Sequence, residues 1–384
     1  MAEAYIVEAI RTAGGRRGGA LAGWHPIDLG AAVLDAVVHR TGIDPSSIED
    51  VIMGCVDQGG EQALHIGRNA VLASSLPRSV PAVSIDRQCG SSQQAIQFAA
   101  QAVLSGTQDV VIAAGVESMT RVPMGSTAGP GDTKSPGLEE RYPGINFSQF
   151  LGAEMIAEKH GFERDALDAF ALESHKRAAK ATSGGAFARE ILPLNVTKAD
   201  GTSAVHDKDE GIRYDATIES IGSVRLLREN GRISAANASQ ICDGASAVLV
   251  VSERALKEHN LTPLARVHNL TVTGGDPVIM LEEPLFATDR ALKRAGMTID
   301  DIDLYEVNEA FAPVPLAWLK HTGADPEKLN VNGGAISLGH PLGASGTKLM
   351  ATLVHALRAR GGKYGLQTMC EGGGLANVTI IEAL

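Results

Sequence analysis

The sequence predicts an α/β fold in which two similar halves, each a mixed sheet layered with helices, flank an inserted loop domain. Three observations support this prediction. Short apolar runs typical of strands alternate with amphipathic helical patterns along the 384-residue chain. One stretch of that alternation occurs twice, and the middle of the chain interrupts it with many glycines and prolines. Alternation of strands and helices is typical of sheets covered by helices.

The first repeated unit is a helix followed by a strand. A helical pattern over 29–42 is followed by an acidic connection and an apolar strand within 43–54. Its counterpart is a helical pattern over 287–296, followed by a similar connection and strand within 297–308. In both units the helix ends at a glycine, which tolerates the left-handed backbone common at that position. Chance similarity between α/β units is the alternative, but the matching order favours duplication.

The second repeated unit is a helix that begins at a glycine-rich turn and leads to a buried strand. Residues 90–104 predict the helix and 110–115 the strand in the first half. Residues 343–357 and 364–370 predict the same pair in the second half. Both repeated units therefore occur in the same order in each half.

These repeats divide the chain into three parts. Residues 1–118 with 236–263 are expected to form the N-terminal half, and 264–384 the C-terminal half. Residues 119–235 between them are expected to form the insertion, in which 150–180 show a strong helical pattern. Long insertions are usually functional, so we expect this one to bind a ligand and to form a lid. The alternative is a structural flap that contacts no ligand.

Composition excludes several classes of function. A formal net charge of −11 argues against general binding to nucleic acids or anionic membranes. No apolar stretch approaches the ~20 residues that a membrane span needs. The N-terminus lacks the pattern of a signal peptide, so a cytoplasmic location is expected. The four cysteines show no CxxC spacing, so neither a zinc site nor a disulfide framework is expected, and Cys55 and Cys242 are assigned to packing.

Cys89 is the first candidate catalytic residue. It stands where a strand-like run stops and a Gly-Ser-Ser turn opens a helix. Unpaired N–H groups and the helix dipole at such a position favour the thiolate, which predicts a reactive sulfur. A buried cysteine that acts only as a small apolar residue is the alternative.

Four more candidates lie in the second half. His340, in a Gly-His-Pro-Leu-Gly turn, offers an imidazole that could activate a thiol near neutral pH. Cys370 could act as an acid or base if the site lowers its pKa from ~8.5. Gly372 and its neighbours leave backbone N–H groups free for an oxyanion. Asn308 could position a water or an enolate oxygen, or could simply be a turn residue.

The segments 84–95, 308–311, 333–346 and 368–374 together resemble the thiolase family, and the resemblance covers essentially the whole chain. It implies a duplicated thiolase-like fold. It also implies an acyltransferase that cleaves a 3-ketoacyl-CoA with coenzyme A, giving acetyl-CoA and a shortened acyl-CoA. The cycle would be ping-pong through an acyl-cysteine, reversible as a Claisen condensation, and would serve fatty acid or sterol catabolism.

The resemblance also implies a role for each catalytic candidate. Cys89 would be the nucleophile, and His340 would activate it. His340 and a water held by Asn308 would stabilise the enolate. Cys370 would move the proton of coenzyme A or of the acetyl methyl group. The N–H groups of Cys89 and Gly372 would form a second oxyanion hole.

Coenzyme A is implied to be a co-substrate, with no metal or redox cofactor. The candidate contacts are Ser239 and Ala235 at the pantetheine arm, Ala310 and Phe311 in the wall of the site, and Arg213 and Arg225 at the nucleotide phosphates. Acidic residues are interleaved with the arginines, so a solvated face of mixed charge is the alternative for them.

Departures from the family pattern bear on the substrate. Residues 149–152 are Gln-Phe-Leu-Gly where short-chain enzymes usually carry a Met-Gly pair, and the preceding loop is short. Both features favour longer or bulkier acyl groups, including sterol side chains. A short-chain acetoacetyl-CoA thiolase is the alternative.

Two further alternatives belong to other classes. The first is a decarboxylating condensing enzyme of the ketoacyl synthase type, which Cys370 together with residues 308–311 argues against. The second is a non-enzymatic acyl-CoA carrier, which the presence of Cys89, His340, Cys370 and Asn308 argues against. The family also implies a homo-oligomer, either a dimer or a tetramer.

Overall fold

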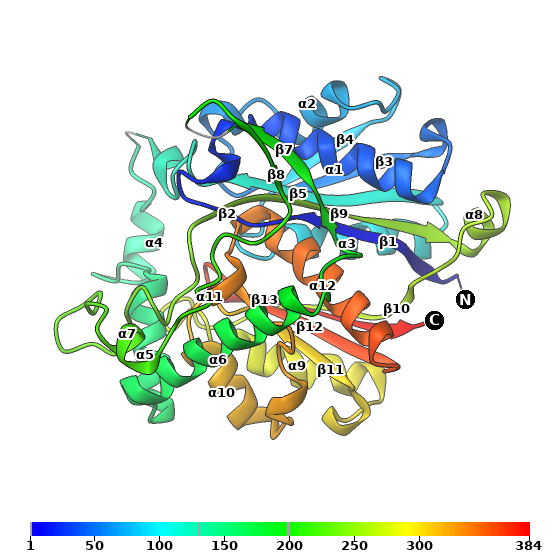
Figure 1. The fold of residues 1–384 in the computed structure, drawn as a ribbon. Helices are drawn as coiled ribbons and strands as arrows, with labels where there is room; N and C mark the ends of the chain where they lie inside the picture. Colours follow the sequence, from blue (N-terminus) through cyan, green and yellow to red (C-terminus); the bar gives the residue numbers. More distant parts are fainter. Residues whose placement is uncertain (1, 130, 198–199) are drawn as a thin grey trace.

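The computed structural model describes residues 2–129, 131–197 and 200–384. Within these ranges, eleven strands form one mixed sheet (Figure 1). Nine of them form its main path, in the order β11 (Leu304–Val307), β12 (Tyr364–Glu371), β13 (Leu375–Ala383), β10 (Ala265–Gly274), β1 (Ala4–Thr12), β9 (Cys242–Ser252), β5 (Val110–Ser118), β3 (Asp50–Gly54) and β4 (Ala82–Ile85). The other two are β2 (Gly15–Arg16), which pairs with β9, and β6 (Ile191–Leu192), which pairs with β1.

The two halves repeat the same strand directions. β3 is parallel to β5, and β9 pairs antiparallel with both β5 and β1. In the second half β11 is parallel to β12, and β13 pairs antiparallel with both β12 and β10. The halves join through a short antiparallel pairing of Tyr5 with Arg266 and Ile6 with Ala265. This arrangement confirms the predicted duplication.

Helices lie on both faces of the strands and between the halves. The central pair is α3 (Ser91–Leu104) and α12 (Ser345–Ala359), which contact each other. The outer helices are α1 (Pro26–Thr41) and α2 (Ile66–Ala73) on the first half, and α9 (Glu283–Ala295) and α10 (Pro313–Thr322) on the second (Figure 1). The central helices therefore bring their N-termini to the junction of the halves.

Local sequence explains where these helices begin and end. α1 has Pro26 in its first turn, where the missing N–H costs nothing, and ends at Gly42 with φ +67°. The equivalent α9 ends at Gly296 with φ +68°. α3 is buried on nearly every side and carries glutamines as well as apolar residues. Gln97 satisfies its amide by donating to the carbonyls of Thr271 and Val378.

The segment between β5 and β9 contains four helices: α4 (Pro136–Arg141), α5 (Gln149–His160), α6 (Arg164–Ser183) and α7 (Ile218–Gly222). It also holds β6 and a separate hairpin of β7 (Leu194–Thr197) and β8 (Ser203–His206). The helical pattern predicted over 150–180 is confirmed as two helices, because Gly161 adopts φ +71° and ends α5 before α6 begins.

Two short helices complete the described structure, α8 (Glu253–Glu258) after β9 and α11 (Ala335–Leu338) before His340. α5 packs on α10 and α6 packs on α11, so this part of the insertion rests on the C-terminal half. The division of the chain into three parts stays a prediction. Among the described helices, none is long and apolar enough to cross a bilayer.

Candidate active site

The site forms where the N-terminal ends of α3 and α12 meet. A Cβ on Gly346 would lie 2.0 Å from the backbone N of Gln93, so only glycine permits this approach. Thr347 N–H donates to Ser92 Oγ at 3.0 Å across the same contact. The Cys89 turn precedes one helix and the His340 turn precedes the other. The fold thereby brings motifs from both halves into one place.

The turn at Cys89 is fixed by short local hydrogen bonds. Gln88 adopts φ +49°, a left-handed backbone that is uncommon for a residue with a side chain. Asp86 Oδ1 accepts its N–H at 2.6 Å, and Ser91 Oγ donates to its carbonyl at 2.6 Å. Ser91 Oγ also accepts the N–H of Arg87 at 2.9 Å. These bonds hold Cys89 directly before α3, with 8% of its surface exposed.

The two candidate sulfurs are neutral thiols in this state. Burial raises the pKa of Cys89 to about 12, with the negative charge of Glu371 as the next cause. Burial, followed by the neighbouring Cys89, raises the pKa of Cys370 well above its ordinary value. Desolvation therefore opposes the thiolate that the helix N-terminus favours, so Cys89 needs a base to take its proton before it can attack.

The turn after Cys370 lies against the turn at Cys89. A Cβ on Gly372 would lie 2.8 Å from Oε1 of Gln88, so the glycine-rich turn and the nucleophile turn are in contact. Glu371, next to Cys370, is also buried there, and neither of its carboxyl oxygens has a hydrogen-bond partner among the described residues. Sequence reasoning missed Glu371, although a charged residue inside a buried strand is a usable signal.

His340 is oriented by Ser345. Nδ1 of His340 lies 2.5 Å from Ser345 Oγ, and that hydroxyl donates to the carbonyl of Pro341 at 2.9 Å. Since serine has one proton, His340 must donate from Nδ1, which leaves the lone pair on Nε2. Nδ2 of Asn308 lies 3.4 Å from that Nε2. Burial, then the charge of Lys348, lowers the pKa of His340 to about 3, so the imidazole is a neutral base.

Glu117 is a buried carboxyl that fixes the His340 turn from the other half of the chain. It accepts from Gly343 N at 2.8 Å, Val56 N at 2.9 Å and Gln62 Nε2 at 2.8 Å. These bonds tie the turn before α12 to the turn after β3. Glu117 gave no sequence signal beyond its place in an apolar strand.

A cleft of about 450 Å³ opens beside His340. Four predicted contacts with coenzyme A line it: Ala235, Ser239, Phe311 and Arg213. The cleft also has lining residues that sequence reasoning did not single out as contacts: Arg16, Arg17, Met119, Met124, Gln149, Phe150, Leu227, Gln240, Ile241, Ala238 and Leu342.

Two predicted contacts lie apart from the cleft lining. Ala310 is buried, and its carbonyl accepts the N–H of Ser239 at 2.9 Å, so it supports the lining from behind. Arg225 is exposed and does not belong to the lining. Arg16 and Arg17 supply positive charge there instead.

A second cavity of about 620 Å³ adjoins the cleft. Phe150 and Leu227 line both spaces. The Phe150 ring packs edge-to-face on Phe311, with centroids 5.6 Å apart. The second cavity is also lined by Leu151 and Ile233, so an apolar group could extend from the cleft past Phe150.

Family models match nearly the whole chain, one described as "Thiolase, N-terminal domain" over residues 4–254 and one as "Thiolase, C-terminal domain" over 261–383. The chain belongs to the thiolase family. The resemblance inferred from the sequence motifs is confirmed, and the protein is an acyltransferase by family. The first match runs through the insertion to the end of β9, and the second covers β10 to β13.

Relatives and solved thiolase structures agree with this assignment. A steroid 3-ketoacyl-CoA thiolase of Mycobacterium tuberculosis is 52% identical, over 100% of this chain and 95% of the relative. A 3-ketoacyl-CoA thiolase of Aeromonas salmonicida is 42% identical over 100% of both chains. The human mitochondrial 3-ketoacyl-CoA thiolase superposes with a TM-score of 0.90 at 37% identity, over 100% of this chain and 99% of the other. The acetyl-CoA acetyltransferase of Bacillus anthracis superposes with a TM-score of 0.91 at 35% identity, over 100% of this chain and 99% of the other.

Proposed function

We propose that this thiolase cleaves 3-ketoacyl-CoA with coenzyme A through an acyl group carried on Cys89. The observation that supports this most is the pairing of two buried thiols with a neutral histidine whose Nε2 is free to accept a proton. One thiol can carry the acyl group while the other moves a proton. The two-domain family match supports the same reaction.

In the first half-reaction Cys89 Sγ attacks the 3-keto carbon and its proton passes to Nε2 of His340. The bond between C2 and C3 breaks, and its electron pair forms the enolate of acetyl-CoA. His340 and a water held by Asn308 stabilise that enolate, and Cys370 protonates its C2. Acetyl-CoA leaves and the shortened acyl group stays on Cys89.

In the second half-reaction the thiol of coenzyme A loses its proton to Cys370 and attacks the acyl-cysteine. The N–H groups of Cys89 and Gly372 hold the oxyanion, and the Cys89 thiolate leaves and recovers its proton from His340. The steps balance without a metal or redox cofactor, so coenzyme A is a co-substrate. Thiolysis and condensation use the same steps in opposite directions.

For the other end of coenzyme A, we propose that Arg16, Arg17 and Arg213 attract the nucleotide phosphates. All three are exposed side chains that line the cleft. Guanidinium groups match phosphate oxygens in geometry and charge. Ser239 and Ala235 would then contact the pantetheine arm between these arginines and His340.

For the acyl group, we propose a bulky or ring-bearing substrate of lipid or sterol catabolism. Residues 149–152 are Gln-Phe-Leu-Gly where a short-chain enzyme usually carries a Met-Gly pair, and Phe150 lines both the cleft and the 620 Å³ cavity. The 52% identical relative is named a steroid thiolase. A short-chain acetoacetyl-CoA enzyme is the second candidate, because a relative named acetyl-CoA acetyltransferase shares the fold.

A substrate panel tests this choice. Thiolysis would be measured for acetoacetyl, medium-chain, long-chain and ring-bearing 3-ketoacyl-CoA, with malonyl-CoA decarboxylation as a control for the ketoacyl synthase reaction. We expect the highest kcat/KM for a bulky acyl group. Leu227→Trp, which narrows the passage, should lower kcat/KM for bulky substrates and spare acetoacetyl-CoA. A clear preference for acetoacetyl-CoA would replace the bulky-substrate proposal by the short-chain one.

We also propose a homo-oligomer, with a dimer formed through β4. β4 is the last strand of the sheet, and its Val83 is 40% exposed. Leu64 is 90% exposed and Phe98 40% exposed in the same half. An exposed sheet edge with apolar neighbours favours pairing with a second copy. Light scattering should show a dimer or tetramer, and Val83→Lys should weaken the association between the copies. We also propose a cytoplasmic location.

A further inference from the structure

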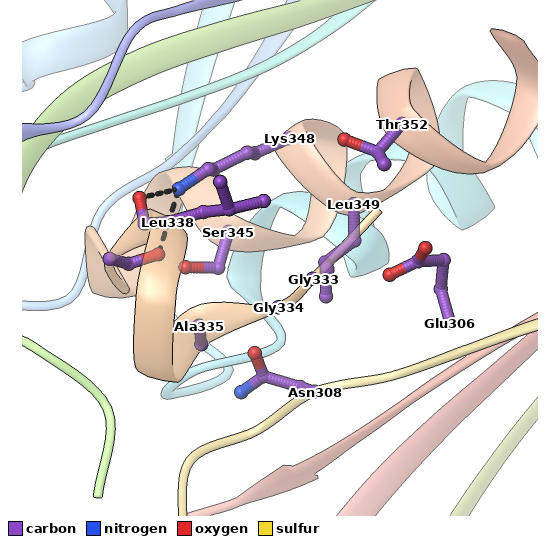
Figure 2. A pocket seen from close by; sticks show the side chains of 11 residues that line it. Glu306, Asn308, Gly333, Gly334, Ala335, Leu338, Ser345, Lys348, Leu349 and Thr352 are labelled. Carbon is purple, nitrogen blue, oxygen red and sulfur yellow. Dashed lines mark hydrogen bonds between the residues drawn. The ribbon is translucent and has the colours of Figure 1, made fainter. Parts of the chain in front are cut away.

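A small cavity lies beside the His340 turn, between the end of β11 and the start of α12 (Figure 2). About 10 Å³ of it is open to the centre of a water-sized sphere, which is roughly the space that one water needs. Its polar lining includes Glu306, Asn308, Ser345, Lys348 and Thr352. The site described above uses Asn308 and Ser345 but leaves Glu306 without a role.

Two buried oxygen atoms in this lining have no donor. Oδ1 of Asn308 and Oε2 of Glu306 lack a hydrogen-bond partner among the described residues, and each residue is 1% exposed. The two residues are two positions apart at the end of a strand, so their side chains lie on the same side. Figure 2 shows both among the side chains that line the cavity. One water can satisfy both oxygens.

The donor at Oδ1 decides which way the Asn308 amide is turned. Nδ2 of Asn308 lies 3.4 Å from Nε2 of His340. The reversed amide would place Oδ1 against the lone pair of Nε2, so two acceptors would face each other. A donor on the cavity side therefore selects the orientation in which Nδ2 faces His340.

Charge balance around the cavity makes Glu306 a neutral acid. Arg11 pairs with Glu190 at 2.6 Å and with Asp209 at 2.7 Å, and all three side chains are buried. Lys348 is buried too, and donates to the carbonyls of Leu338 and Gly339.

The two cations therefore offset the charges of Glu190 and Asp209. An ionised Glu306 would add a third negative charge without a counter-ion. Burial, then the charges of Glu309 and Glu190, raises the pKa of Glu306 well above its ordinary value. A neutral carboxyl can donate a hydrogen bond.

We propose that Glu306 is a positioning residue of the reaction: as a neutral acid it donates to one water in this cavity, and that water donates to Oδ1 of Asn308. The amide of Asn308 is thereby kept with Nδ2 toward His340. This role rests on the proposed thiolase cycle, in which Asn308 and His340 hold the enolate. Glu306 acts through Asn308 and does not touch the substrate.

Paired substitutions test the role. Glu306→Gln keeps the size and an N–H donor, whereas Glu306→Met keeps the approximate size without a donor. We expect Glu306→Gln to retain kcat within about threefold and Glu306→Met to lose about tenfold, the effect of one hydrogen bond of ~1.4 kcal/mol. KM for coenzyme A should stay unchanged in both. Glu258→Met, on the exposed face of α8, is the control for the same change of side chain.

A double-mutant cycle identifies the residue through which Glu306 acts. In an Asn308→Ala background, Glu306→Met should cost less than twofold, because the amide that it orients is gone. An equal tenfold loss there would overturn the proposal. So would equal losses in Glu306→Gln and Glu306→Met, or no loss in either. Thermal unfolding of each variant separates a lost role from a lost fold.

A crystal structure tests the same inference without activity. It should show one ordered water between Glu306 and Oδ1 of Asn308. An empty cavity, or an Asn308 amide with Oδ1 facing His340, would overturn the role of Glu306. Absence of thiolysis in the wild-type protein, with this water in place, would instead contradict the proposed function.

Discussion

The carboxyl group of Glu371 lies in contact with Gly90, the residue that follows the proposed nucleophile. A Cβ on Gly90 would lie 1.9 Å from Oε1 of Glu371, so any other residue at position 90 would displace this carboxyl. Burial raises the pKa of Glu371 well above its ordinary value. The negative charge of an ionised Glu371 also raises the pKa of Cys89. Deprotonation of Glu371 therefore opposes formation of the Cys89 thiolate.

Glu371→Gln should change the reactivity of Cys89 only above the raised pKa of Glu371. Below that pKa, both proteins carry a neutral side chain at 371 and should be alkylated by iodoacetamide at equal rates. Above it, the wild-type carboxylate opposes the thiolate, so the variant should react faster. Peptide mass spectrometry at each pH would assign the adduct to Cys89. A slower variant above that pKa, or a difference confined to lower pH, would contradict this account.

Ser345→Ala should lower kcat by about 10-fold to 100-fold, which is part of the ~10²–10⁴ that positioned acid–base groups contribute. Loss of the hydroxyl removes the acceptor that fixes Nδ1 of His340, so the ring can turn and Nε2 is no longer held toward the site. Steady-state kinetics would measure the loss. Thr347→Val is the matched control, because it also removes a buried hydroxyl from α12. That hydroxyl hydrogen-bonds with Ala344 and Ser246 and not with His340. Equal losses in both variants would contradict the role of Ser345.

Cys370→Ala should separate the two half-reactions. Cys89 should still become acylated when a 3-ketoacyl-CoA is added, because its activation by His340 is intact. Water must then protonate the acetyl-CoA enolate in place of Cys370, so acylation should be slower but should still go to completion. Steady turnover should fall by about 10² or more, since the proton of coenzyme A loses its acceptor. Rapid quenching followed by mass spectrometry would compare acylation with turnover. Normal turnover in this variant would remove Cys370 from the mechanism.

Arg16→Gln and Arg213→Gln should each raise KM for coenzyme A by about twofold to fivefold, because exposed ion pairs contribute only ~0.2–1 kcal/mol. kcat at saturating coenzyme A should stay unchanged. Added salt should reduce the difference in KM between each variant and the wild type. Arg225→Gln is the control, as its side chain is exposed outside the cleft lining. If Arg225→Gln gave the largest rise in KM, Arg225 would be the arginine that contacts the nucleotide phosphates, as the sequence predicted.

The sequence was sufficient to predict the repeated elements and the catalytic candidates, because both depend on local patterns. Apolar periodicity placed β3, β5, β11 and β12 and the helices before them. It did not show where α5 ends and α6 begins, because Gly161 takes a left-handed backbone that periodicity does not record. The motifs around Cys89 and His340 were visible as a thiol and an imidazole in glycine-rich turns.

The supporting residues were not visible, since their roles arise from contacts between distant segments. Glu117 accepts the N–H of Gly343 from 226 positions away. Glu306 gains its role only from a cavity that the folded chain encloses. The burial that raises the pKa of Cys89 was not visible either, because the helix terminus is a local feature whereas burial comes from the whole fold. The sequence therefore predicted which residues carry the chemistry, but not the burial and the distant contacts that surround them.

The acyl-enzyme is the measurement that tests the central claim most directly. The protein would be mixed with a 3-ketoacyl-CoA in the absence of coenzyme A, quenched in acid and analysed by intact and peptide mass spectrometry. We predict one shortened acyl group per chain, located on Cys89, absent in Cys89→Ala and released when coenzyme A is added. An acyl group on another residue, or turnover by Cys89→Ala, would contradict the account.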